Sequence, residues 1–115
     1  MKGNIIKEKT FAFGIRIVKL CKYLDETKRE FILTNQLKRS GTAVGAMVME
    51  AEHAESKKDF IHKMTIALKE ANESIYWIQM LKAGEYISQK EFDSIHYDCE
   101  EIIKILAAIV KSSKA

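Results

Sequence analysis

The side chains best suited to chemistry in this chain are three histidines, each preceded by an acid three residues earlier. The pairs are Glu50 with His53, Asp59 with His62, and Asp93 with His96. Di-metal four-helix bundles use Glu-x-x-His pairs on two helices plus two further glutamates, all facing inward. Only one pair here carries Glu, and His53 and His62 fall off the apolar stripes described below. We therefore predict no metal site, and a metal- or ligand-binding bundle is the weakest of three functional interpretations.

No other arrangement of side chains predicts catalysis. The chain shows no Ser/His/Asp or Cys/His pattern, and Gly41 and Gly45 follow no strand, so they do not form a phosphate-binding loop. Cys21 and Cys99 lie on or beside apolar stripes and are expected to be reduced core residues, because cytosolic disulfides are rare. A bridge between the first and last helices is the alternative. We predict no enzymatic activity, no cofactor and no catalytic residue.

Length and composition suit one domain over residues 1–115. Hydrophobic residues make up 47% of the chain and charged residues 30%, with five glycines and no proline. Scarce helix breakers together with many Ala, Leu, Ile, Glu and Lys favour helices. The N-terminus lacks the apolar core of a secretory signal, and no run approaches the ~20 apolar residues that span a bilayer. We expect a cytoplasmic protein with no membrane partner.

Four apolar stripes with helical spacing divide the chain. The expected helices cover residues 10–24, 31–54, 57–83 and 89–111, with a charged connection at 25–30. In the first, Phe13, Ile17, Leu20 and Leu24 recur at spacings of four, three and four, which places them on one helix face. The stripes of the other three helices keep the same rhythm. They are Leu33, Leu37, Ser40, Val44, Met47 and Ala51 in the second, Phe60, Met64, Ala67, Ala71, Ser74, Ile78 and Leu81 in the third, and Phe92, Ile95, Cys99, Ile102, Leu106 and Ile109 in the fourth. Short connections between consecutive helices make neighbours antiparallel. We therefore predict an all-α, antiparallel, up-down-up-down four-helix bundle.

Local signals mark several helix ends. Residues 88–91, Ser-Gln-Lys-Glu, form a full capping box, and residues 56–59 resemble one with Asp in the acidic position. Gly84 lies where a C-terminal cap belongs. Either Thr27 or Thr34 could cap the second helix, so its start is left open.

The second expected helix has no charge between Ser40 and Met49. A helix that is apolar all round is normally buried on more than one side, and a chain of this size cannot bury it completely. Gly41 and Gly45 lie one turn apart, and each costs ~1 kcal/mol relative to Ala inside a helix. They predict close approach by another helix, with tolerated flexibility as the alternative. We expect a homo-oligomer.

The third expected helix offers a second candidate contact surface. Tyr76, Trp77 and Met80 point away from the apolar stripe, and aromatic and Met residues are enriched in interfaces. Ordinary, partly exposed surface is the alternative. The candidate interface residues are thus Gly41, Gly45, Met49, Tyr76, Trp77 and Met80.

Basic residues concentrate near the N-terminus. Residues 1–30 hold eight Lys or Arg against four Asp or Glu, although the whole chain is only +3. Repeated by symmetry, such a group can hold phosphate backbones without reading sequence. A solvated helix face is the alternative. The candidate nucleic-acid-binding residues are Lys7, Lys9, Arg16, Lys19 and Lys22.

Two segments carry a resemblance to a known family. Residues 36–46 read Gln-Leu-Lys-Arg-Ser-Gly-Thr-Ala-Val-Gly-Ala, with Glu50 and Ala51 following. Residues 56–71 and Glu73, Ser74, Tyr76 and Trp77 continue the pattern. The chain resembles four-helix-bundle proteins of the S23 type, first noticed as products of intervening sequences in bacterial 23S rRNA genes. The likeness extends from Phe13 to about Ile109.

The resemblance implies an antiparallel bundle that assembles as a homopentamer and has no assigned enzymatic activity. A related branch comprises accessory proteins of diversity-generating retroelements, which associate with reverse transcriptase and with RNA or DNA. The leading interpretation is therefore a non-enzymatic assembly module that serves as a nucleoprotein scaffold with weak, non-specific nucleic-acid binding. The alternative is a protein–protein interaction module that binds no nucleic acid.

Overall fold

The computed structural model describes residues 2–115, with side chains from Ile5 onward, and that part of the chain contains four α-helices and no strand. They are α1 (Lys2–Thr27), α2 (Ile32–Glu52), α3 (Lys57–Ala83) and α4 (Gln89–Lys114). The predicted all-α four-helix bundle is confirmed.

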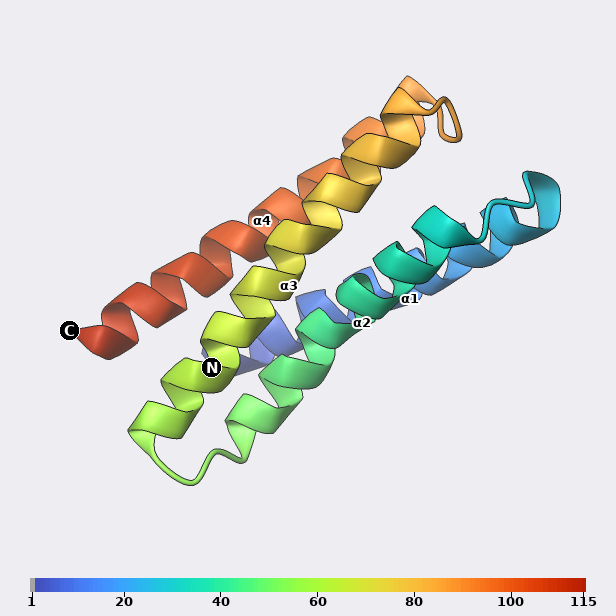
Figure 1. The fold of residues 1–115 in the computed structure, drawn as a ribbon. Helices are drawn as coiled ribbons and strands as arrows, with labels where there is room; N and C mark the ends of the chain where they lie inside the picture. The colour runs from blue at the N-terminus through green and yellow to red at the C-terminus, as the bar shows by residue number, and fades with distance from the viewer. Residues whose placement is uncertain (1) are drawn as a thin grey trace.

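Consecutive helices are antiparallel neighbours, and the bundle measures 44 × 21 × 20 Å. The most extensive contacts join α1 to α2, α2 to α3, and α3 to α4, whereas α1 touches α4 over a much shorter stretch. Figure 1 shows the α1–α2 and α3–α4 pairs separating toward the ends that carry their connecting loops. The bundle is thus two helical hairpins joined mainly through α2 and α3.

The apolar stripes meet in one core, as their spacing predicts. The fully buried positions from all four stripes include Phe13, Ile17, Leu24, Leu37, Val44, Met64, Ala67, Ala71, Ile78, Leu81, Ile95, Cys99, Ile102 and Leu106. Ser40, Ala51 and Ser74 of the stripes are buried as well. Six other stripe positions are partly buried and pack against the core: Leu20, Leu33, Met47, Phe60, Phe92 and Ile109.

The first helix is longer than predicted at both ends. It begins at Lys2 instead of residue 10 and continues to Thr27, into the expected connection. Ile6 and Thr10 are buried and extend the stripe of Phe13 and Ile17 by two steps of four and three residues. Because no residue in this region breaks a helix, burial of Ile6 carries the helix toward the N-terminus.

The predicted caps are right for α3 and α4 and wrong for α2. Ser56 Oγ accepts a hydrogen bond from the Asp59 N–H at 3.0 Å, and both bonds of the Ser88–Glu91 capping box are present. Neither Thr27 nor Thr34 caps α2: each hydroxyl donates to a carbonyl one turn earlier, from Tyr23 and Glu30 respectively. The carboxylate of Glu30 accepts from the Leu33 N–H instead.

The end of α3 also differs from the expectation in one detail. Gly84 occupies the C-cap position, but its backbone is right-handed, with φ −81°. The left-handed residue is the following one, Glu85, with φ 66°.

Candidate interaction surfaces

The two glycines of α2 bring α1 and α2 close together within one chain. A Cβ on Gly41 would lie 2.9 Å from both γ carbons of Ile17, and one on Gly45 would lie 3.3 Å from the Thr10 carbonyl oxygen. The predicted close approach of another helix is confirmed, and that helix is α1. Gly41 is buried beneath Ile17, so it offers no surface to a second subunit and its candidate interface role is replaced by internal packing.

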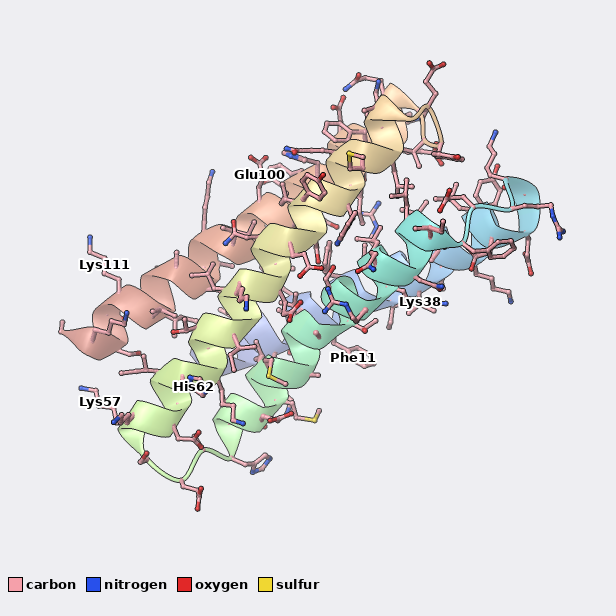
Figure 2. All side chains as sticks on the ribbon, viewed as in Figure 1. Phe11, Lys38, Lys57, His62, Glu100 and Lys111 are labelled. Carbon is pink, nitrogen blue, oxygen red and sulfur yellow. The ribbon has the colours of Figure 1, made fainter. Side chains whose placement is uncertain are left out.

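On the outer side of this contact, α1 and α2 border a half-open apolar groove of about 770 Å³. Its walls include four exposed side chains: Phe11 (67% exposed), Ile15 (41%) and Val18 (44%) from α1, and Met49 (52%) from α2. Gly14, Gly45 and Ala46 also line it. Figure 2 shows Phe11 projecting away from the helices. Two sequence candidates, Gly45 and Met49, belong to this groove.

Gly14 is the one glycine in this region without an internal explanation. It lies in the middle of α1, where glycine costs roughly 1 kcal/mol relative to alanine. A Cβ built on it would meet no atom within 4 Å, unlike those on Gly41 and Gly45. The groove therefore has a floor of glycine backbone that another helix could approach closely.

The three aromatic and Met candidates on α3 do not form one uniform surface. Tyr76 is 52% exposed and Met80 is 38% exposed, and both face outward. Trp77 is half-buried and packs edge-on against Tyr76, with ring centroids 4.9 Å apart. Its indole N–H donates to Glu73 of the same helix at 3.0 Å, and Glu73 in turn pairs with Arg39 of α2.

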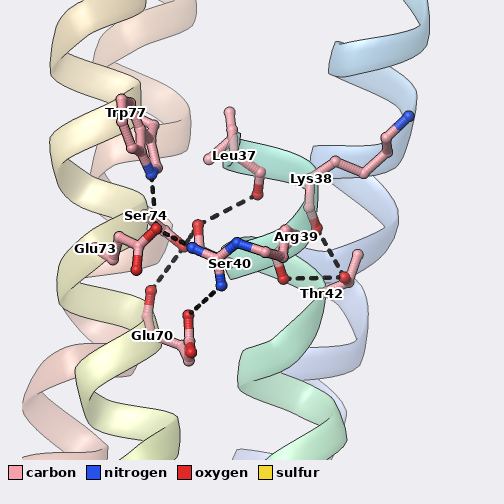
Figure 3. A network of polar contacts seen from close by, with 9 residues as sticks. All are labelled: Leu37, Lys38, Arg39, Ser40, Thr42, Glu70, Glu73, Ser74 and Trp77. Atoms are coloured by element: carbon pink, nitrogen blue, oxygen red, sulfur yellow. Dashed lines mark hydrogen bonds and ion pairs between the residues drawn. The ribbon is translucent and has the colours of Figure 1, made fainter. Parts of the chain in front are cut away.

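A polar network joins α2 to α3 beside Trp77 (Figure 3). Arg39 of α2 forms ion pairs with Glu70 and Glu73 of α3. Beneath them the hydroxyls of Ser40 and Ser74, both fully buried, lie 2.9 Å apart. Ser74 also donates to the Glu70 carbonyl, so the buried pair is satisfied. This network fixes the pairing of the two hairpins.

Three of the five basic candidates are engaged in ion pairs within the chain. Lys7 contacts Glu52 at 2.9 Å, Lys9 contacts Glu101 at 3.0 Å, and Arg16 contacts Asp98. The hydrogen bond from Lys7 lowers the pKa of Glu52, as expected when the charged form is favoured. These pairs link α1 to α2 and α4, so the three basic side chains have a structural role within the chain.

Lys19 and Lys22 differ from the other three basic candidates. Both are exposed, and within the described part of the chain neither forms an ion pair. The five residues therefore do not form a single basic patch. Three face acids of α2 or α4, Lys19 borders the α1–α2 groove, and Lys22 is exposed elsewhere on α1. Sequence spacing placed them on one helix but could not show which acids face them.

The cysteines and histidines take up positions that agree with the sequence expectations. Cys21 and Cys99 are buried, free thiols that contact the carbonyls of Thr34 and Ala71. Burial raises the pKa of Cys21 to about 11 and that of Cys99 to about 12, because a thiolate loses its hydration there. The alternative of a disulfide is wrong.

His53 and His62 are exposed, as predicted, and His96 lies against Phe92 with ring centroids 4.8 Å apart. Among the described residues, no three His, Cys, Asp or Glu side chains are grouped so that they could hold a metal ion. In the same range, no helix is both long and apolar enough to cross a bilayer.

Comparison with known proteins agrees with this architecture. The model of 23S rRNA-intervening sequence proteins matches residues 2–108. The chain belongs to this family. A 1.70 Å crystal structure from Bacteroides thetaiotaomicron VPI-5482, described as a protein with unknown function from the S23 ribosomal protein family, is 48% identical to it. The match covers 96% of this chain and 99% of that one, with a TM-score of 0.95. No curated protein matches the chain.

The resemblance drawn from residues 36–46 is thus confirmed, and the structure gives these family residues a physical role. Ser40 and Gly41 are buried, one facing Ser74 of α3 and the other facing Ile17 of α1. Arg39 lies outside them and closes the ion pairs to α3. In this member of the 23S rRNA-intervening sequence protein family, the segment packs α2 between its two neighbours.

One surface was missed by the sequence analysis. Phe11, Ile15 and Val18 recur at spacings of four and three, which is a second apolar stripe on the helix whose first stripe is Phe13 and Ile17. The spacing was visible in the sequence. Only the structure shows that α2 leaves this second stripe uncovered.

Proposed function

We propose that this chain is a non-enzymatic, homo-oligomeric assembly module. The observation that carries the proposal is the α1–α2 groove, whose exposed apolar walls and glycine floor remain uncovered in a single chain. Contiguous apolar surface of this kind marks interaction sites in proteins that are otherwise well packed. The exposed Tyr76 and Met80 on α3 supply a second apolar surface for the same purpose.

Two further observations support the absence of enzymatic activity. The family and the solved relative indicate no enzymatic class, and the relative is described as having unknown function. The two cysteines are buried with raised pKa values, which disfavours nucleophilic thiolates at neutral pH. From the family resemblance we infer a pentamer, and we place it in the cytoplasm as part of the same proposal.

The assembly is tested by measuring its mass in solution. Light scattering coupled to gel filtration at micromolar concentration should give a multiple of the 13.2 kDa chain, with five copies expected. Native mass spectrometry should give the same number. A mass of one chain across the micromolar range would contradict the proposal.

Nucleic-acid binding is a second candidate, favoured by the exposed and unpaired Lys19 and Lys22 within the described residues. Repeated around an oligomer, these lysines could bind phosphates together even though each subunit contributes few charges. RNA, DNA or a nucleic-acid-bound protein such as a reverse transcriptase are the partners that the family resemblance suggests. Such binding would make the assembly a nucleoprotein scaffold.

The measurement is fluorescence anisotropy with labelled RNA and DNA over a salt series. Each phosphate neutralised on duplex DNA contributes about −0.9 to the log-log slope. Lys19→Gln with Lys22→Gln should flatten that slope, whereas the matched control, Lys57→Gln with Lys111→Gln, removes the same charge from other exposed sites and should not. No wild-type binding at ~50 mM salt would favour the protein–protein interaction module without nucleic acid. Equal loss in both variants would show that Lys19 and Lys22 do not form the binding site.

A further inference from the structure

We propose that the α1–α2 groove receives the outer stripe of α3 from a second copy of this chain. This stripe consists of Lys69, Asn72, Tyr76 and Met80, all exposed and spaced by three or four residues. The inference rests on the proposed homo-oligomer and names the two surfaces that meet in it. The contact is head-to-tail, because the groove and the stripe are different parts of the molecule.

Shape favours the stripe as the occupant. The groove is hollow between α1 and α2, so two grooves facing each other would leave space between them. A single helix that carries protruding side chains can instead enter it and approach the bare backbone at Gly14. A two-fold dimer through the groove would also leave Tyr76 and Met80 uncovered, whereas a head-to-tail contact covers both surfaces in every subunit.

The heights of the two surfaces along the bundle match. Ser40 lies opposite Ser74, and Gly41 lies against Ile17, so these residues share one level of α1, α2 and α3. Tyr76 is two residues beyond Ser74, which places it within one turn of the level of Val18. In a closed ring without axial rise, neighbouring copies keep the same levels. Tyr76 of one copy therefore meets Val18 of the next.

Charge is complementary at the other end of the contact. Lys69 lies five residues before Ser74, and Gly45 lies five residues after Ser40, so in this antiparallel pair both stand at one level. Gly45 touches Thr10, which is two residues from Glu8 on the rim of the groove. Within the described residues, neither Lys69 nor Glu8 has an ion-pair partner. Lys69 of one copy can thus reach Glu8 of the next.

The exposed apolar area is close to what a specific contact needs. The exposed fractions of Phe11, Ile15, Val18, Met49, Tyr76 and Met80 correspond to roughly 550 Å², taking ~150–220 Å² for each whole side chain. A specific interface at the lower size limit buries about 1,200 Å² in total, of which a little over half is non-polar. These six side chains supply most of that non-polar area.

Cysteine cross-linking tests which surfaces meet. Val18→Cys combined with Tyr76→Cys should form intermolecular disulfides under mild oxidation and give a ladder up to the native oligomer. Neither single variant should cross-link, because each places its new thiol against a different surface; the native thiols are buried. Cross-linking by Val18→Cys alone would show that two grooves face each other and would overturn the proposal.

Charge reversal gives an independent measurement. Glu8→Lys and Lys69→Glu should each weaken assembly by roughly fivefold per interface, and the double variant should restore it. Phe11→Lys should weaken assembly by more than about tenfold, whereas Tyr97→Lys, at an exposed aromatic outside both surfaces, should not. A monomeric wild type would contradict the proposed function itself. An oligomer that tolerates Phe11→Lys, and whose assembly is not restored in the Glu8→Lys and Lys69→Glu double variant, would contradict only the assignment of its surfaces.

Discussion

Replacing Gly41 with alanine should destabilise the folded chain although alanine is the better helix former. The helix preference alone would favour Gly41→Ala by about 1 kcal/mol. The new methyl group would lie 2.9 Å from both γ carbons of Ile17, a fully buried and β-branched side chain that cannot turn away easily. Overpacking of this kind costs about 1–3 kcal/mol. We expect a net loss of about 1 kcal/mol in the free energy of unfolding.

The cause of that loss can be isolated with a second substitution. Ile17→Ala removes both close atoms, so in that background Gly41→Ala should become stabilising by about 1 kcal/mol, giving a coupling of about 2 kcal/mol. Ile17→Val retains two γ carbons and should not reverse the sign. Urea unfolding followed by circular dichroism measures each variant, at several protein concentrations because the proposed assembly would shift the midpoint.

Two outcomes would refute this reasoning. A stabilising Gly41→Ala in the native background would show that Ile17 yields without cost. Unchanged stability of the chain combined with loss of the oligomer would show that Gly41 contacts another subunit, as the sequence alone had suggested.

Three further predictions concern single sites. Ser74→Ala should lower the free energy of unfolding by about 1–2 kcal/mol, because it leaves the Ser40 hydroxyl with only a 3.4 Å contact to the Leu37 carbonyl. Ser40→Ala should lower it less, because the Ser74 hydroxyl still donates to the Glu70 carbonyl. Chemical unfolding compares the two variants, and equal losses would contradict this assignment of donors and acceptors. Glu85→Gly should raise the melting temperature by a few degrees, because a backbone φ of 66° strains any residue that has a side chain. A lower melting temperature in this variant would contradict that strain. Cys21 and Cys99 should resist a thiol reagent in the native protein at pH 8 and react in urea. Native reactivity at pH 8 would contradict their burial. Because folding raises their pKa from 9.0 to about 11 for Cys21 and about 12 for Cys99, their contribution to stability is complete below pH 9 and is lost as the pH rises through 11 and 12.

Much of the fold could be predicted because helices are local structures with local signals. The spacing of Phe13, Ile17 and Leu24 defined a buried face, and the Ser88–Glu91 capping box began α4 at the predicted residue. The extension of α1 to Lys2 was not predicted, because it depends on the burial of Ile6 against the other helices, a tertiary contact that the local sequence does not reveal. The family was recognisable because residues 36–46, with Arg39, Ser40 and Gly41, resemble its second-helix motif.

The candidate sites were less predictable because each depends on what lies opposite a residue. The sequence by itself determined that α2 carries two glycines where another helix comes close, and that α1 is rich in basic residues. Only the tertiary structure decided that this helix is α1 of the same chain and that Lys7, Lys9 and Arg16 face acids from α2 and α4. It also decided that Phe11, Ile15 and Val18 are left exposed by the other described helices of the chain. A helical stripe specifies a face of its own helix. Whether that face is covered depends on the angle at which neighbouring helices cross, and this angle is set by contacts between residues far apart in the sequence.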